Sequence, residues 1–122
     1  MNIKTMVKNN ISIAVVQSDE VIITDVHSAL DMLATTIYET GCNCIVLNKA
    51  AITEDFFKLS TRLAGEVLQK FINYRIKLAI VGDFSNYTSK PLKDFIYESN
   101  HGKDVFFVST EDSAIEKLAS AQ

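Results

Sequence analysis

Short runs of apolar residues alternate along this chain with longer segments in which apolar positions recur every three or four residues. The runs cover residues 11–16, 44–47, 78–81 and 105–108. Residues 11–16 include Ser12 but are rich in β-branched residues, as strands are, and the other runs are unbroken, which is typical of parallel strands that are covered on both faces. The run at 78–81 lies within residues 76–89, IKLAIVGDFSNYTS, and is followed by Gly82-Asp83 and a polar loop. We therefore expect it to be the central strand of the fold.

The periodic segments predict four helices. The first begins at Thr24 or Asp25 and stops before Gly41, and the second has an apolar stripe from Phe56 to Phe71. The third begins at Ser89 or Lys90 with Pro91 in its first turn, and the fourth is capped by Ser109 or Thr110. Polar N-cap residues, a proline at the helix start and a glycine after the end are the usual signals for these boundaries. Gly65, in the middle of the second helix, predicts a close approach of that helix to the sheet.

Residues 21–24, VIIT, read as a further short strand. Only residues 17–20 separate them from the run at 11–16, so the two are expected to form an antiparallel hairpin at one edge of the sheet. Residues 1–10 are predicted to be a flexible lead-in.

The predicted order is β-β-α-β-α-β-α-β-α, which indicates one α/β domain over residues 11–122. Such alternation favours a mostly parallel sheet with right-handed crossovers and helices packed on it. Because an unblocked edge strand can pair with another chain, a homodimer through residues 11–16 is one expected state.

Composition narrows the classes of function. The net charge of −3 offers no electrostatic basis for general nucleic-acid binding. The N-terminus lacks the apolar region of a secretory signal, and no apolar run approaches the length of a membrane span. A cytoplasmic location without membrane attachment is therefore expected. Cations outnumber anions between Lys70 and Lys103, which indicates a solvated face or a site for a small anion or an acidic partner.

Neither a metal site nor a cofactor is predicted. Cys42 and Cys44 are the only cysteines, and their spacing sends the side chains to opposite faces of a strand. His27 and His101 are too few to complete a zinc site. The glycine-rich phosphate-binding motifs and the G-x-S-x-G nucleophile motif do not occur in the sequence.

The candidate site residues follow the predicted strands, because ligands of open parallel sheets bind outside the carboxyl ends of the strands. The residues that could contact a ligand or a partner are Asp25, Asn48, Lys49, Asp83, Phe84, Ser85 and Tyr87. Helix capping is the simpler role for Asp25, whereas Lys49 and Asp83 are not obvious caps. Phe84 and Tyr87 are either displayed as interface anchors or folded back onto the core. No catalytic residue is predicted.

Two family resemblances add to this picture. The order of elements resembles the sulphate-transporter and anti-sigma-factor antagonist fold, in which a serine or threonine at a helix start is phosphorylated. The matching region here is NKAAITEDFF, residues 48–57, where Thr53 is the only hydroxyl. The resemblance implies a phosphorylation site at Thr53, and capping of the long helix is the alternative role.

The second resemblance covers nearly the whole chain after residue 10. The runs ITDVHSALDMLAT, YETGCNCIVLNKAAITEDFF and GEVLQKFINYRIKLAIVGDFSNYTSKPLKDFIYESNHGKDVFFV are similar to the bacterial family of domains of unknown function numbered 4180. This resemblance implies a bacterial cytosolic domain and no particular activity.

Two functions remain open on this basis. The first is a non-catalytic regulatory or protein-interaction module of the anti-sigma-factor-antagonist type, with a protein partner. The alternative is a small-ligand-binding domain or a small enzyme that uses the polar residues at the strand ends.

Overall fold

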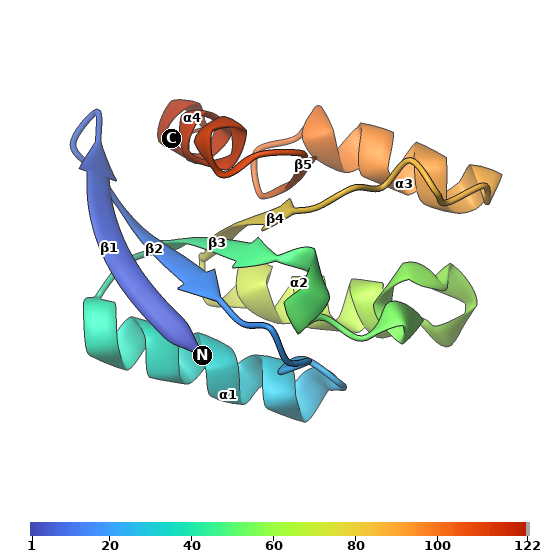
Figure 1. The fold of residues 1–122 in the computed structure, drawn as a ribbon, viewed down its shortest axis with the longest axis horizontal. Coiled ribbons are helices and arrows are strands. Elements are labelled where there is room, and N and C mark those ends of the chain that lie inside the picture. Colours follow the sequence, from blue (N-terminus) through green and yellow to red (C-terminus); the bar gives the residue numbers. More distant parts are fainter. Residues whose placement is uncertain (122) are drawn as a thin grey trace.

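A computed structural model describes residues 1–121 of this chain as a five-stranded sheet with four α-helices (Figure 1). The strands are β1 (Asn2–Lys8), β2 (Ile11–Gln17), β3 (Cys44–Asn48), β4 (Lys77–Val81) and β5 (Val105–Val108). The helices are α1 (Val26–Thr40), α2 (Leu63–Asn73), α3 (Lys90–Asn100) and α4 (Glu111–Ser120). Only β1 and β2 pair antiparallel, and the other pairs are parallel. The predicted fold class, a small α/β domain with an antiparallel edge hairpin, is confirmed.

The strands lie in the sheet in the order in which they occur in the chain. Because parallel crossovers are right-handed, strands added successively in one direction place every crossover helix on the same face. Apolar residues of α1, α2 and α3 accordingly share one core cluster with alternate residues of the strands. After the last strand the chain crosses to the other face, where α4 packs alone, and Figure 1 shows it opposite α1 and α2.

The edge hairpin differs from the predicted one. The antiparallel partner of β2 is β1, which lies in the segment expected to be a flexible lead-in, and residues 21–24 do not form a strand. The turn consists of Asn9 and Asn10, whose φ angles of +52° and +66° match the type I′ turn that two-residue hairpins favour. Asparagine tolerates positive φ better than most residues, so Asn9-Asn10 was the local signal for this hairpin. Ile23 only bridges to Ile52.

The long second helix is also shorter than its apolar stripe indicated. Residues 49–61 form three 3₁₀ turns, Lys49–Ala51, Glu54–Phe57 and Leu59–Thr61, and α2 begins only at Leu63. The hydroxyl of Thr61 donates to the carbonyls of Asp55 and Lys58, each at 2.8 Å, and so offers the backbone an alternative to helical hydrogen bonds. Arg62 then adopts φ +64°. The aromatic residues of the stripe are buried all the same, because 3₁₀ turns return side chains to the core at a similar spacing.

Most predicted helix boundaries are correct. Asp25 caps α1, Gly41 ends it at φ +67°, Ser89 caps α3 with Pro91 in the first turn, and Thr110 caps α4. The expected close approach at Gly65 is wrong, because a Cβ placed there has no atom of another segment within 4 Å. No helix within residues 1–121 is long and apolar enough to cross a membrane.

Candidate functional site

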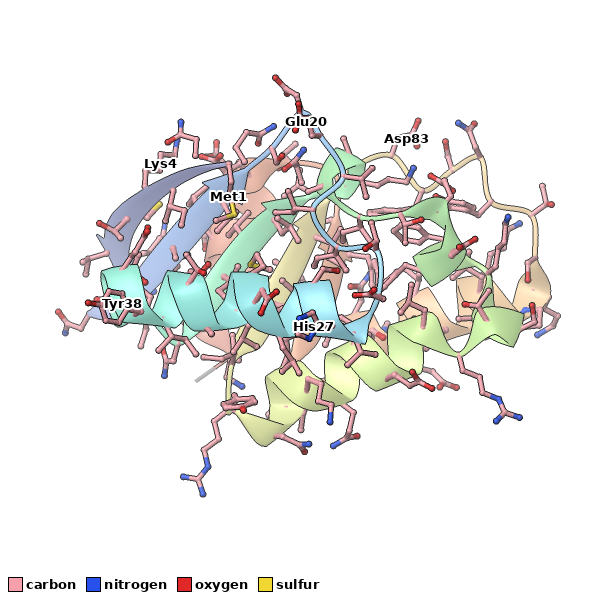
Figure 2. The ribbon with its side chains drawn as sticks, turned by 90° about the horizontal axis from the view of Figure 1, so that it is seen from below. Met1, Lys4, Glu20, His27, Tyr38 and Asp83 are labelled. Carbon is pink, nitrogen blue, oxygen red and sulfur yellow. The ribbon has the colours of Figure 1, made fainter. Side chains whose placement is uncertain are left out.

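The candidate site lies where β3 and β4 end, between the 3₁₀ segment of residues 49–61 and the loop of residues 82–89. The sequential strand order has no reversal, so the sheet lacks the switch-point crevice in which open α/β sheets usually bind ligands. The site is instead formed by these two connecting segments, which contact each other beyond the strand ends. Figure 2 shows Asp83 at this end of the sheet, pointing away from the helices.

Lys49, Glu54 and Tyr87 form the centre of the site. The Nζ of Lys49 lies 3.2 Å from Glu54 Oε1, and the hydroxyl of Tyr87 donates to Oε1 and Oε2 of Glu54 at 3.1 and 2.9 Å. The ammonium group also lies 5.0 Å from the ring centre of Tyr87 and 5.4 Å from that of Phe57, within the range of cation–π attraction. The carboxylate of Glu54 thus joins the 3₁₀ segment to the loop. Lys49 contacts this carboxylate and the ring of Tyr87.

A group of aromatic side chains packs between this cluster and the core. Phe57 is buried and stacks on Tyr87 with ring centres 5.1 Å apart, and it also contacts Phe84 at 5.9 Å. Phe84 meets Phe107 of β5 edge to face at 5.5 Å. Both loop aromatics are half-buried, so of the two alternatives left open by the sequence, folding back onto the core is the correct one.

Gly82 is required by the position of Lys49. A Cβ on Gly82 would lie 2.5 Å from the Cβ of Lys49 and 2.8 Å from its Cδ. The stem of Lys49 therefore packs directly against the backbone at the end of β4. This contact directs the ammonium group toward Glu54 and Tyr87.

Asn48 connects β3 to the chain leaving β2. Its side-chain oxygen accepts from the backbone N–H of Ser18 at 2.9 Å, and its amide nitrogen donates to the carbonyl of Ser18 at 2.7 Å. Both ends of the amide are used within the protein. Asn48 thus closes the loop over the carboxyl ends of β2 and β3.

Asp25, Asp83 and Ser85 are engaged locally. Asp25 accepts from the N–H of Ser28 at 2.8 Å and forms a capping box with it at the start of α1. Asp83 Oδ1 accepts from the N–H and the hydroxyl of Ser85 at 2.9 and 2.6 Å, which fixes the first turn of the loop. Asp25 stands apart from the Lys49 cluster, whereas Asp83 is close enough for the charge of Lys49 to act on it.

Thr53, the predicted phosphorylation site, lies at the start of the second 3₁₀ turn. Its hydroxyl accepts from the N–H of Asp55 at 3.5 Å, and its own N–H donates to the carbonyl of Ile23 at 2.9 Å. The side chain is half-buried. Capping is the role these contacts support, although the cap belongs to a 3₁₀ turn and not to the long helix.

The electrostatics of the cluster hold each group in its ordinary charge state. The Tyr87 hydroxyl and the Glu54 carboxylate raise the pKa of Lys49. Burial acts to raise the pKa of Glu54, but the hydrogen bonds from Tyr87 and Lys49 outweigh it, so the pKa is lowered. Burial raises the pKa of Tyr87. At neutral pH the cluster therefore contains an ammonium, a carboxylate and a neutral phenol.

The pKa values of three further groups also shift in the direction that keeps each group charged at neutral pH. Hydrogen bonds from the amide and hydroxyl of Ser28 lower the pKa of Asp25, and those from the hydroxyl and amide of Ser85 lower the pKa of Asp83. The Asp94 carboxylate, 2.6 Å away, raises the pKa of Lys90. Each of these shifts moves the pKa away from pH 7.

A groove runs beside the cluster, between the 3₁₀ segment and the start of α3. Its volume is about 540 Å³ and its lining residues are Glu54, Phe57, Lys58, Leu59, Ser60, Asn86, Tyr87, Thr88, Ser89, Pro91 and Leu92. Phe57 and Leu92 are buried, Leu59 and Tyr87 are half-buried, and the other lining residues, most of them polar or charged, are exposed. The groove is therefore apolar at its base and polar at its border.

Sequence reasoning missed two members of the site, Glu54 and Phe57. Both lie within residues 48–57, where only Asn48, Lys49 and Thr53 were predicted to be site residues. The signal that could have found them is the density of polar and aromatic residues in TEDFF directly after a strand. Within residues 1–121, no three His, Cys, Asp or Glu side chains are grouped as a metal ion would require.

The pH dependence of stability tests the Glu54 interactions. Because the folded pKa of Glu54 lies below its ordinary value, the stabilisation is fully present above that ordinary value and is lost as pH falls through the folded pKa. We expect the stability difference between wild type and Glu54→Gln, measured by urea denaturation, to be largest near neutral pH and to shrink on acidification. A difference that is independent of pH between 7 and about 3 would contradict this assignment.

Comparison with known proteins identifies the family. No curated protein and no solved structure matches the chain significantly. Residues 8–118 match a family whose description is "Domain of unknown function (DUF4180)", and this match covers every element of the fold from β2 to α4 except the last residues of that helix. The chain therefore belongs to the DUF4180 family of domains of unknown function.

Proposed function

We propose that this domain is a non-catalytic regulatory module that binds a protein partner through the surface formed by residues 49–61 and 82–92. The observation that carries the proposal is the groove, which combines buried apolar side chains with polar neighbours and whose two walls are joined by the hydrogen bonds from Tyr87 to Glu54. The pKa directions agree with this proposal, because general acid–base catalysis is most efficient when the pKa of the catalytic group lies near the working pH. Among the residues described, every resolved shift moves the pKa away from pH 7, including those of Lys49, Glu54, Tyr87 and Asp83.

The groove supports protein binding in its composition. Protein interfaces combine an apolar centre with a polar rim, and side chains inserted into pockets contribute most of the affinity. Here the lining residues Phe57 and Leu92 are buried and Tyr87 is half-buried, whereas Lys58, Ser60 and Asn86 are exposed. A partner segment that inserts an apolar side chain between hydrogen-bonding neighbours fits this groove.

The rigidity of the groove walls supports the same proposal. One wall is the series of 3₁₀ turns and the other is the loop of residues 82–89. The hydroxyl of Tyr87 in the loop donates to the carboxylate of Glu54 in the turns, and Lys49 binds the same carboxylate from within the 3₁₀ segment. Preorganised walls lose little conformational entropy on binding. The cluster of Lys49, Glu54 and Tyr87 thus holds the two walls of the groove at a fixed separation.

The resemblance of the order of elements to anti-sigma-factor antagonists supplies the regulatory part of the proposal. Thr53 is the only hydroxyl in the region of residues 48–57 that this resemblance matches to the phosphorylated segment. A phosphate added there would lie next to Glu54 and Asp55, so it would repel these carboxylates and disturb the wall. Phosphorylation of Thr53 stays a prediction of that resemblance.

The experiment is site-specific photo-cross-linking in cells of the natural source. A photoreactive residue is introduced at Asn86, on the groove rim, and as a control at Thr35, which is exposed on the outer side of α1. We expect one major protein adduct from position 86 that position 35 does not form. Equal adducts at both positions, or no adduct at position 86, would contradict the proposal.

A purified partner then allows a quantitative test. Ser60→Trp fills the groove from its exposed rim and is expected to weaken binding at least about tenfold without a change in stability. Thr35→Trp is the matched control and should bind with wild-type affinity. Wild-type affinity in the Ser60 variant would place the binding surface elsewhere.

A further inference from the structure

The outermost strand of the sheet, β1, has an open edge. It is paired with β2 on one side over seven consecutive residue pairs from Asn2 to Lys8, and Figure 1 shows no other element along its far side. Seven residues is long for an edge strand, and β1 contains no proline and no bulge in its pairing. Natural proteins normally block such edges, because the unpaired backbone groups are a template for another strand.

The hairpin geometry determines which backbone groups face outward. The residues that flank a two-residue turn, here Lys8 and Ile11, form a hydrogen-bonded pair. Hydrogen-bonded pairs alternate along an antiparallel ladder, so Lys8, Met6, Lys4 and Asn2 direct their N–H and C=O groups to β2. The N–H and C=O groups of Ile3, Thr5 and Val7 therefore point away from the sheet.

The lysines of β1 do not block this edge. Lys4 pairs with Glu111 at 3.4 Å and Lys8 with Glu116, both of them residues of α4. Their side chains thus extend over the face that α4 covers. Edge lysines protect a strand by keeping charge beside the open backbone groups, whereas these two are drawn back onto the molecule.

We propose that the open edge of β1 pairs with β1 of a second copy of this chain, antiparallel and with Thr5 opposite Thr5. In this register Ile3 lies opposite Val7 of the second copy, and every outward N–H and C=O of these residues finds a partner. A twofold axis through the Thr5 pair makes the interface self-complementary, as a symmetric dimer requires. The two sheets become one continuous sheet.

The side chains agree with this register on both faces. Val7 is 66% exposed, which is unusual for a valine in a strand, and it becomes covered by Ile3 of the second copy. On the other face Lys4 lies opposite Met6 and Lys8 opposite Asn2, so no like charges are directly opposed. A second copy therefore fits this edge in both its backbone register and its side chains. The interface is distant from the groove, so the dimer is independent of the proposed partner binding.

Cysteine cross-linking tests the register. Thr5→Cys places the new thiols across the twofold axis at the Cα separation of about 5.5 Å expected for a hydrogen-bonded pair, which is suitable for a disulfide. Asn2→Cys is the matched control on the same strand, because its two copies lie roughly 20 Å apart at about 3.4 Å per residue. Under mild oxidation we expect a covalent dimer from the Thr5 variant alone. Equal cross-linking of both variants, or none, would overturn the proposal.

A second pair of variants tests the interface without disulfide chemistry. Val7→Lys puts a charge opposite Ile3 and is expected to raise the dimer dissociation constant at least about tenfold in sedimentation equilibrium, with thermal stability of the monomer unchanged. Tyr97→Lys changes a residue of equal exposure, 65%, on α3 beside the opposite edge strand, and should leave the dimer intact. A monomeric wild type, or equal effects of the two lysines, would overturn the proposal.

Discussion

Replacement of Phe56 with alanine is expected to lower the free energy of unfolding by about 3–5 kcal/mol. Phe56 is 1% exposed and stands among the largest fully buried side chains of the protein, although it belongs to a 3₁₀ turn and not to a regular helix or strand. Removing its ring leaves a cavity that short, hydrogen-bonded turns on either side cannot collapse to fill. Chemical denaturation monitored by circular dichroism measures the loss.

The control for this prediction is Tyr38→Ala. Tyr38 is 91% exposed, so the substitution removes an aromatic ring without opening a cavity and should change stability by less than about 0.5 kcal/mol. A small effect at Phe56 would mean that the 3₁₀ segment lies loosely on the sheet. The segment could then not serve as a fixed wall of the groove, and the proposed binding surface would lose its physical basis.

Gly82→Ala is expected to destabilise the protein by about 1–3 kcal/mol, the range for overpacking in a close-packed site. The added methyl group would lie 2.5 Å from the Cβ of Lys49. Since that Cβ is attached to the backbone, the end of β3 or β4 has to shift. We expect the displacement of Lys49 to break its contact with Glu54, which nuclear magnetic resonance can detect as a rise in the pKa of Glu54.

Gly65→Ala is the matched control and should have the opposite sign. Gly65 lies inside α2 with open space where its Cβ would be. Alanine there relieves the conformational cost of a helical glycine and is expected to stabilise the protein by about 0.5–1 kcal/mol. If both glycine variants are destabilised equally, steric crowding by Lys49 is not the reason for Gly82.

Local chemistry explains which parts of the fold were predictable. The helix starts at Asp25, Ser89 and Thr110 were readable because a cap bonds to backbone groups only two or three residues away. The apolar runs identified β2 to β5 for a similar reason, since a strand covered on both faces needs apolar residues at every position. The hairpin was mispredicted because VIIT has strand-forming residues, whereas β1 is largely polar. Strand propensity favoured residues 21–24, whereas tertiary pairing selected β1 as the partner of β2 in the hairpin.

The second helix shows a limit of periodicity. An apolar stripe records which side chains face the core, and a series of 3₁₀ turns meets that requirement as well as an α-helix does over one or two turns. The hydrogen bonds from Thr61 to the backbone, and the left-handed conformation of Arg62, decide between them. Those contacts depend on the path of the whole segment across the strand ends.

The candidate site was half predictable. Lys49 and Tyr87 were selected because both follow strands, and the structure places them in one cluster. Glu54, which joins them, is separated from Tyr87 by 33 positions in the chain, and no local pattern specifies that pairing. Phe84 packs against the core because it contacts Phe57 and Phe107, which come from two other segments of the chain. The sequence around Phe84 does not specify these contacts.

The sequence by itself determined the fold class, the family, the positions of most helix boundaries and the residues that line the strand ends, because each follows from local periodicity, capping chemistry or direct similarity. Only the tertiary structure decided the strand order, the antiparallel partner of β2, the 3₁₀ path of residues 49–61 and the cluster of Lys49, Glu54 and Tyr87. These features depend on contacts between residues far apart in the chain. Such contacts form only when crossover handedness and core packing have brought the segments together.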